Sequence, residues 1–124
     1  MNEAKRQIDR VMPELLDLVR PLSEGLKGPL DNILYVWVPG LTNDDIVIQA
    51  LVNTEEGFEL GIWDAAYSQS IFCSCVGWRR EMPDEFFTRA HKALHRFIER
   101  LMEEFKLIAE PCRPLLAILE PTLA

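Results

Sequence analysis

Apolar residues in the first part of the chain recur at steps of three and four. They are Ile8, Val11, Met12, Leu15, Leu16, Val19, Leu22 and Leu26. This spacing predicts an amphipathic helix over residues 3–26. Proline interrupts the pattern, so either the helix kinks at Pro13, or an arm over residues 1–12 ends there and Pro13 opens a second helix.

After Pro29 the period of the pattern changes to two, which is typical of strands. Four segments rich in β-branched and aromatic residues follow: Ile33–Val38, Asp45–Val52, Phe58–Asp64 and Ser70–Trp78. Their short connections favour an antiparallel meander. Residues 53–57 read as the turn between the second and third strands, which places Asn53 opposite Phe58.

That register puts apolar residues on both faces of the sheet. Leu51 opposes Leu60 and Val47 opposes Asp64 on one face, and Ile48 opposes Trp63 on the other. In a sheet with one solvated face, apolar and polar residues alternate more regularly along each strand. The second face therefore needs a cover, from the C-terminal tail, a second subunit or a ligand. We expect a homodimer; the alternative is that the two helices lie on opposite faces.

A long helix is predicted from Pro83 to about Glu110, because one apolar stripe continues through it. The stripe comprises Phe87, Ala90, Leu94, Phe97, Ile98, Leu101, Phe105 and Ile108. Pro111 then stops the helix. The proline-rich tail over residues 111–124 is expected to pack on the domain or on a partner subunit, because Leu115–Leu119 is apolar.

The predicted fold is α+β. A four-stranded antiparallel meander is flanked by a kinked N-terminal helix and a long C-terminal helix, in the order α-β-β-β-β-α, as a two-layer sandwich. The 124 residues suit one domain over 1–124.

The net charge of −7 arises in the middle of the chain. Residues 31–78 hold seven carboxylates and no Lys, Arg or His, whereas acids and bases balance on either side. This argues against nucleic acid and anionic membranes, which need basic residues. The N-terminus lacks a signal-peptide pattern and the three cysteines lack framework spacing, so we expect a cytoplasmic protein without a membrane span.

In a meander, the carboxylates of the central segment gather at the ends of the sheet. Asp44, Asp45 and Asp64 fall at one end, and Glu55 and Glu56 at the other. We call these five residues the acidic rim. The acidic rim could receive a basic protein surface or serve only to solvate the loops, and the three carboxylates at one end, Asp44, Asp45 and Asp64, could instead hold Mg²⁺ or Ca²⁺.

Aromatic and amide side chains on the strands offer a second kind of site. Tyr35, Trp37, Gln49 and Trp63 could line a pocket between sheet and helices for a small apolar ligand, or simply fill the core.

Metal-site signals are weak. His91, His95 and Glu99 form one row on the predicted helix, but Lys92 stands where the H-E-x-x-H motif requires glutamate. Cys73 and Cys75 share a strand face and suit buried small hydrophobes, or a soft metal site completed by a histidine. We expect no metal and no cofactor.

The sequence favours a non-enzymatic adaptor that recognises a basic protein partner through the acidic rim. In size, acidity and fold class the chain resembles, in type only, bacterial immunity proteins and secretion chaperones. A small-molecule binding protein is the alternative, and a metal-dependent hydrolase a third reading. No nucleophile or phosphate-loop motif occurs in the chain.

Overall fold

The computed structural model describes residues 2–25, 33–35, 46–54, 57–64 and 67–119, with the backbone alone for those between 22 and 58. The elements in chain order are α1 (Glu3–Gly25), β1 (Ile33–Tyr35), β2 (Ile46–Thr54), β3 (Gly57–Asp64), β4 (Gln69–Ser74), β5 (Gly77–Trp78), α2 (Asp84–Glu104), the 3₁₀ turn η1 (Lys106–Ile108) and α3 (Ala109–Leu119). The predicted α+β class with an antiparallel sheet is confirmed.

The sheet has five strands in chain order, β1-β2-β3-β4-β5, all antiparallel. The predicted fourth strand over residues 70–78 is two strands, β4 and β5, joined by a turn at Cys75 and Val76. Gly77 follows the turn with a φ of 125°, a conformation that favours glycine. The four-strand prediction missed this hairpin.

A bulge in β2 shifts the predicted register by one residue. Asn53 does oppose Phe58, and Leu51 opposes Leu60, as predicted. The register shifts between Ile48 and Ala50, at Gln49. Beyond it Ile46, not Val47, opposes Asp64, and Val47, not Ile48, opposes Trp63.

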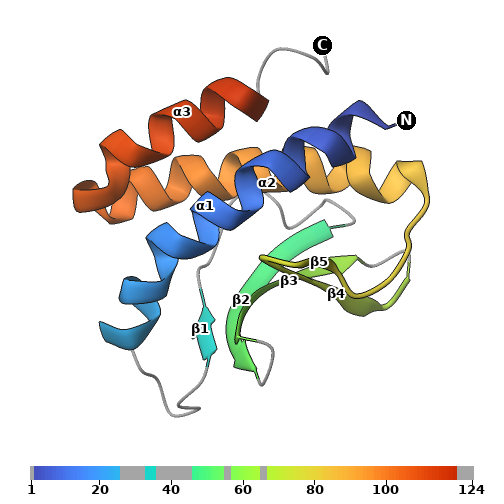
Figure 1. Cartoon of the computed structure of the whole chain (residues 1–124), viewed down its shortest axis with the longest axis horizontal. Coiled ribbons are helices and arrows are strands. Elements are labelled where there is room, and N and C mark those ends of the chain that lie inside the picture. The colour runs from blue at the N-terminus through green and yellow to red at the C-terminus, as the bar shows by residue number, and fades with distance from the viewer. Residues whose placement is uncertain (1, 26–32, 36–45, 55–56, 65–66, 120–124) are drawn as a thin grey trace.

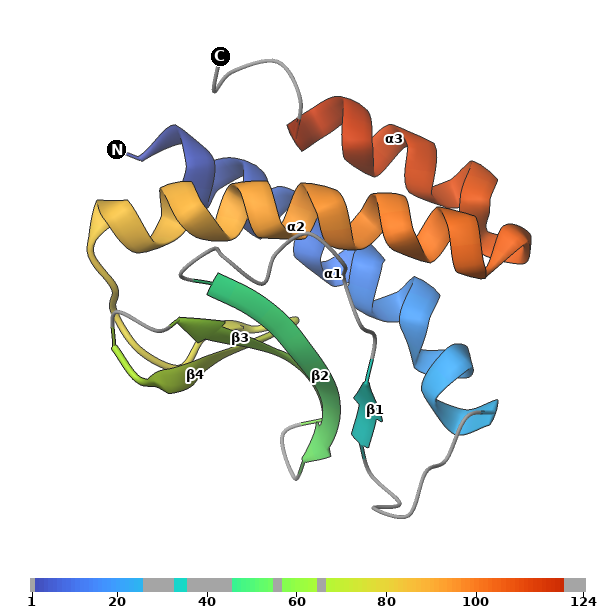
Figure 2. The ribbon, with the colours of Figure 1, turned by 180° about the vertical axis from the view of Figure 1, so that it is seen from behind.

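All three helices lie on the same side of the sheet in Figures 1 and 2. Both α1 and α2 contact strands, and α3 packs against α1 and α2. One core joins the helices to the inner face of β3 and β4, where Leu60, Ile62, Ile71 and Cys73 are buried. On the outer face Trp63 and Phe72 are half-buried.

The N-terminal helix is continuous across Pro13 and Pro21. Residues of the predicted separate arm belong to it, and Ile8, Val11 and Met12 are fully buried in the core. Burial of the apolar stripe from Ile8 to Val19 therefore holds the helix together despite the prolines.

The C-terminal helix ends earlier than predicted, and the tail is helical. The backbone of Phe105 leaves the helical region, so α2 stops at Glu104 rather than near Glu110. Residues 109–119 then form α3, with Pro111 in its first turn, where the missing N–H has no helical partner to lose. Cys112, Leu115 and Leu119 are fully buried, so this segment packs on its own domain.

A candidate binding groove between α1 and the β4–β5 hairpin

An open groove of about 890 Å³ separates the first half of α1 from the β4–β5 hairpin. The start of α2 closes one end of it. Its apolar lining comes from all three elements and includes Met12, Cys73, Trp78, Met82 and Phe87. A volume of this order is typical of ligand and peptide sites.

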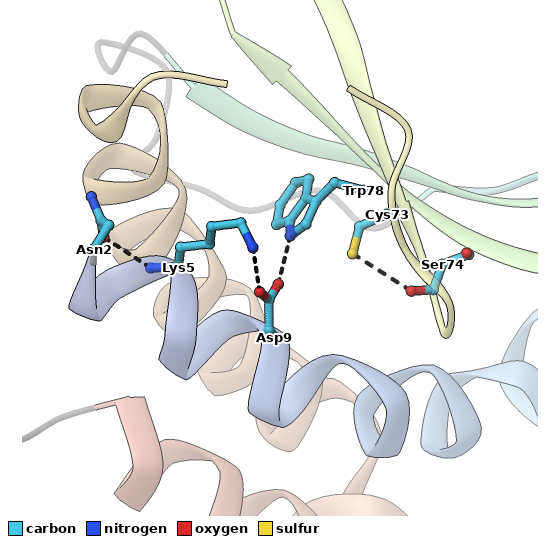
Figure 3. Close-up of polar contacts among 6 residues, drawn as sticks. All are labelled: Asn2, Lys5, Asp9, Cys73, Ser74 and Trp78. Carbon is cyan, nitrogen blue, oxygen red and sulfur yellow. Dashed lines mark hydrogen bonds and ion pairs between the residues drawn. The ribbon is translucent and has the colours of Figure 1, made fainter. Parts of the chain in front are cut away.

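Trp78 is held at the centre of the groove by contacts to both neighbouring helices. Its Nε1 donates a hydrogen bond of 2.6 Å to Oδ1 of Asp9 on α1 (Figure 3). Its ring packs edge-on against Phe86 and Phe87 of α2, with centroids 5.7 and 5.1 Å apart. The short strand β5 thus bridges the two helices through one side chain.

The polar groups that α1 contributes to the groove wall are engaged in hydrogen bonds and an ion pair. The second oxygen of Asp9, Oδ2, accepts from Lys5 Nζ at 2.6 Å. Asn2 caps α1, since its Oδ1 accepts from the Lys5 backbone N–H at 3.0 Å, and its Nδ2 donates to the Asp84 carbonyl at 3.2 Å. This fixes the start of α1 against the start of α2 and so positions Lys5 and Asp9.

The two cysteines that line the groove differ in their exposure. Cys73 is 1% exposed, and burial, followed by the charge of Asp9, raises its pKa to about 12. Cys75 is exposed in the turn. The neutral thiol of Cys73 is a poor nucleophile, because the thiolate is the reactive form.

We expect one thiol of the folded protein to react with iodoacetamide much faster than the other two. Cys75 is the fast one, because Cys73 and Cys112 are buried with raised pKa values. Because the pKa of Cys73 is raised to about 12, its thiolate fraction is about a thousandfold lower than that of an ordinary thiol. Peptide mass spectrometry after timed alkylation identifies each site; equal rates at Cys73 and Cys75 would contradict the buried position of Cys73.

Of the acidic rim, the structure describes Asp64 alone, and places it inside the protein. Asp64 is 0% exposed, and its Oδ2 lies 2.7 Å from an Nη of Arg89 on α2. It is therefore paired internally and does not face a partner. Asp44, Asp45, Glu55 and Glu56 lie outside the described residues.

A second buried carboxylate lies on the outer face of β3. Glu59 is 0% exposed and accepts two hydrogen bonds from Arg79, at 2.7 and 2.6 Å. The guanidinium of Arg79 also lies 5.7 Å from the centre of the Phe72 ring. The two arginines thus neutralise one carboxylate near each end of β3.

Of the four residues predicted to line an aromatic pocket, the structure describes the side chain of Trp63 alone, and Trp63 does not line the groove. Trp63 is on the outer face of the sheet, opposite to the face that Trp78 occupies. The backbone of Tyr35 lies in β1 and that of Gln49 at the bulge in β2, while Trp37 is outside the described residues. The tryptophan of the groove is Trp78, which was not among the residues predicted to line a pocket.

The predicted histidine row is divided between surface and interior. His95 Nδ1 lies 3.1 Å from Glu99 Oε1 on the exposed side of α2. His91 is buried and pairs with Gln7 of α1 instead. Within the described part of the chain, no three His, Cys, Asp or Glu side chains are grouped so as to hold a metal ion.

Arg89, Asp9 and the hairpin turn were missed by the sequence interpretation. The sequence signal for the turn was Gly77, because a glycine inside a strand pattern often marks a bulge or a turn. The pairs Asp9–Trp78 and Asp64–Arg89 join positions far apart in the chain, and no local pattern marks them.

No described helix combines the length and the apolar character that crossing a membrane requires. Comparison with known proteins finds no matching family model, no matching curated protein and no matching solved structure.

Proposed function

We propose that this chain is a non-enzymatic binding protein that recognises a partner protein with a basic surface, and that the groove between α1 and the β4–β5 hairpin holds a segment of that partner. The observation that carries the proposal is the state of the groove's polar groups. Both oxygens of Asp9 are engaged, and the buried thiol of Cys73 is protonated. Such a surface supports contact rather than acid–base or nucleophilic chemistry.

In this proposal the net charge of the chain and the contacts in the groove act on different steps of binding. Three basic groups (Lys5, Arg79, Arg80) and three acidic groups (Asp9, Glu81, Asp84) line the groove, so its own charge is balanced. The net charge of −7 comes from residues 31–78, whose end forms the hairpin. The net negative charge raises the rate of association with a basic partner. The contacts that the partner makes in the groove determine the rate of dissociation.

The hairpin tip supplies an apolar contact beside the groove. Val76 is 84% exposed and lines the groove, whereas Leu107, in the turn before α3, is 96% exposed and lies outside the groove lining. Both side chains are apolar and exposed, so position 76 can report a partner in the groove and position 107 can serve as its control.

We expect a photo-crosslinking residue at position 76, introduced into the full chain in the cells that produce it, to trap a partner that position 107 does not trap. With the partner so identified, association between 50 and 500 mM NaCl is expected to slow roughly tenfold or more while dissociation changes little. Surface plasmon resonance measures both rates. Identical adducts at both positions would exclude the groove, and a salt-independent association rate would exclude the electrostatic part.

A small apolar ligand is the second candidate, favoured by the aromatic and thioether lining around Trp78, Met12 and Met82. Native mass spectrometry of the purified chain separates the two proposals. A bound small molecule of constant mass favours the ligand. The proposed homodimer and cytoplasmic location stay proposals, and the same spectrum gives the subunit number.

A further inference from the structure

One edge of the sheet is open to the groove through the backbone of β5. In the described part of the chain, β5 is last in the strand order and pairs with β4 alone. Gly77 lines the groove although it has no side chain, so its backbone forms part of the wall. A Cβ atom placed on Gly77 would meet no other group within 4 Å, so the space beside this backbone is open. The groove therefore gives access to main-chain atoms as well as to side chains.

The register of β5 directs one backbone donor and one backbone acceptor away from β4. The N–H of Arg79 donates to the Phe72 carbonyl at 3.0 Å. Hydrogen-bonded and non-hydrogen-bonded pairs alternate in an antiparallel ladder, so the adjacent pair, Trp78 opposite Cys73, is a non-hydrogen-bonded one. The N–H and C=O of Trp78 thus point to the free edge, where no described residue bonds to them. An added strand would supply both partners.

Such a strand would place alternate side chains in the groove. The ring of Trp78 is on the inner face of the sheet, where it packs edge-on against Phe87 of α2. Residues directly opposite each other in neighbouring strands point to the same face. The residue that pairs with Trp78 would therefore meet the apolar lining formed by Met12, Met82 and Phe87. An apolar side chain suits this position.

The charges at the α2 end of the groove favour a basic residue in the same strand. Two of the three basic groups of the lining, Lys5 and Arg79, are paired within the chain. The third, Arg80, is outnumbered by Glu81 and Asp84, which are exposed and form no ion pair with a described residue. This local excess of acid complements a Lys or Arg of the occupant.

We propose that the occupant of the groove is an extended segment of the basic partner, which adds to β5 as a further strand of the sheet. The segment bonds to the backbone of Trp78, places an apolar side chain beside its ring, and brings a Lys or Arg to Glu81 and Asp84. This inference rests on the proposed function, because it defines the part of the basic partner that binds. Recognition of this kind draws on main-chain hydrogen bonds and on pockets for alternate side chains.

The length of β5 favours such a segment over a second copy of the chain. β5 has only two residues, and a short edge strand is a weak template for edge-to-edge pairing of two sheets. A peptide segment can enter the groove and gain side-chain contacts that a second β5 strand would not supply.

The first test uses the free chain and needs no partner. Amide hydrogen exchange followed by NMR, corrected for intrinsic rates, is expected to be roughly fivefold or more faster at Trp78 than at Arg79, because only the Arg79 N–H bonds to β4. Equally slow exchange at Trp78 would show that this edge is already covered, and would overturn the proposal. If that protection grows with protein concentration, a second copy is the occupant.

The second test uses peptides selected on the full chain from a phage-displayed random library. We expect the selected peptides to alternate apolar and polar residues and to contain Lys or Arg. In the synthetic peptides, N-methylation of alternate residues should weaken binding about fivefold or more in one register, in which the N–H groups face β5. In the other register it should change binding less than about twofold. Calorimetry measures the affinities, and the Trp78 amide should become protected in the complex.

Matched variants locate the peptide in the groove. Glu81→Gln should weaken peptide binding roughly two- to fivefold, the effect of losing one exposed ion pair. Glu85→Gln is the control, because Glu85 is an exposed acid on α2 that does not line the groove. Its effect should be smaller than that of Glu81→Gln.

Three results would overturn the added strand: no selected peptide, equal sensitivity to N-methylation in both registers, or equal effects of Glu81→Gln and Glu85→Gln. Peptides with apolar residues at helical spacing and equal sensitivity in both registers would replace the strand with a helix and leave the groove proposal in place. The failure of the proposed function is read separately, from identical crosslinks at positions 76 and 107.

Discussion

Replacing Arg89 with leucine is expected to lower the free energy of unfolding by about 3–5 kcal/mol, the cost of removing one partner from a buried ion pair. The carboxylate of Asp64 would be left at 0% exposure without the guanidinium 2.7 Å away. The side chain of Arg89 is itself 29% exposed, so water entering its place favours the lower end of this range. Urea denaturation followed by circular dichroism measures the change.

Two further variants test the reason for that loss. In the double variant Asp64→Leu, Arg89→Leu neither charge of this pair remains, and most of the lost stability should return. In Arg113→Leu the exposed pair with Glu110 is broken, and the cost should stay below about 1 kcal/mol. If Arg89→Leu costs no more than Arg113→Leu, Asp64 is not held as a buried charge.

Replacing Phe87 with alanine is expected to cost about 3–5 kcal/mol, because a fully packed aromatic ring leaves a cavity. The ring is 2% exposed and packs edge-on against Trp78 and Phe86, with centroids 5.1 and 5.2 Å apart. It also lines the groove, so the cavity would open under the binding surface. Thermal and urea unfolding give the stability, and tryptophan emission of the Trp37→Phe, Trp63→Phe background, in which Trp78 alone remains, reports the local change.

The controls for Phe87 are a conservative and an exposed substitution. Phe87→Leu keeps most of the volume and should cost less than half as much. Leu107→Ala, at a side chain 96% exposed, should change the stability by less than about 0.5 kcal/mol. A cost below about 1 kcal/mol for Phe87→Ala would show that the Trp78–Phe86–Phe87 cluster is not a packed core.

The elements that the sequence predicted well are those whose signal is local. The apolar stripe of α2 reappears as buried residues from Phe87 to Leu101, because a helical period repeats every few residues. The pairing of Asn53 with Phe58 was also predicted correctly, because the two residues are close in the chain and the strand patterns on either side fix their register. The bulge at Gln49 has no such signal, since it depends on how two strands meet in space.

The prolines misled the prediction at the C-terminal end of the chain, whereas at the N-terminal end the predicted helix over residues 3–26 is observed as Glu3–Gly25 and only the alternative of a separate arm is wrong. Pro13 and Pro21 lie inside α1 and Pro114 lies inside α3, whereas Pro111 is in the first turn of α3 and has no helical hydrogen bond to lose. A proline removes one hydrogen bond, but the burial of an entire apolar stripe outweighs that loss. Local sequence could not show whether burial would outweigh the lost hydrogen bond, because the residues that pack against each helix are remote in sequence.

The candidate site could not be predicted for a related reason. Asp9 and Trp78 are 69 positions apart, and Asp64 and Arg89 are 25 apart. The sequence interpretation grouped carboxylates by the ends of the predicted sheet, and so it placed Asp64 at a surface. The arginine that neutralises Asp64 belongs to a helix whose placement the strand pattern does not determine.

The strands pair in chain order, so the sheet is built from contacts between segments that are close in sequence. Two residues separate β2 from β3, four separate β3 from β4, and two separate β4 from β5. Each of these pairings encloses a very short loop and loses little chain entropy. The contact of α1 with α3, in contrast, joins the two ends of the described chain. The sheet is thus topologically local, and the largest loop-closure entropy falls on the meeting of the terminal helices.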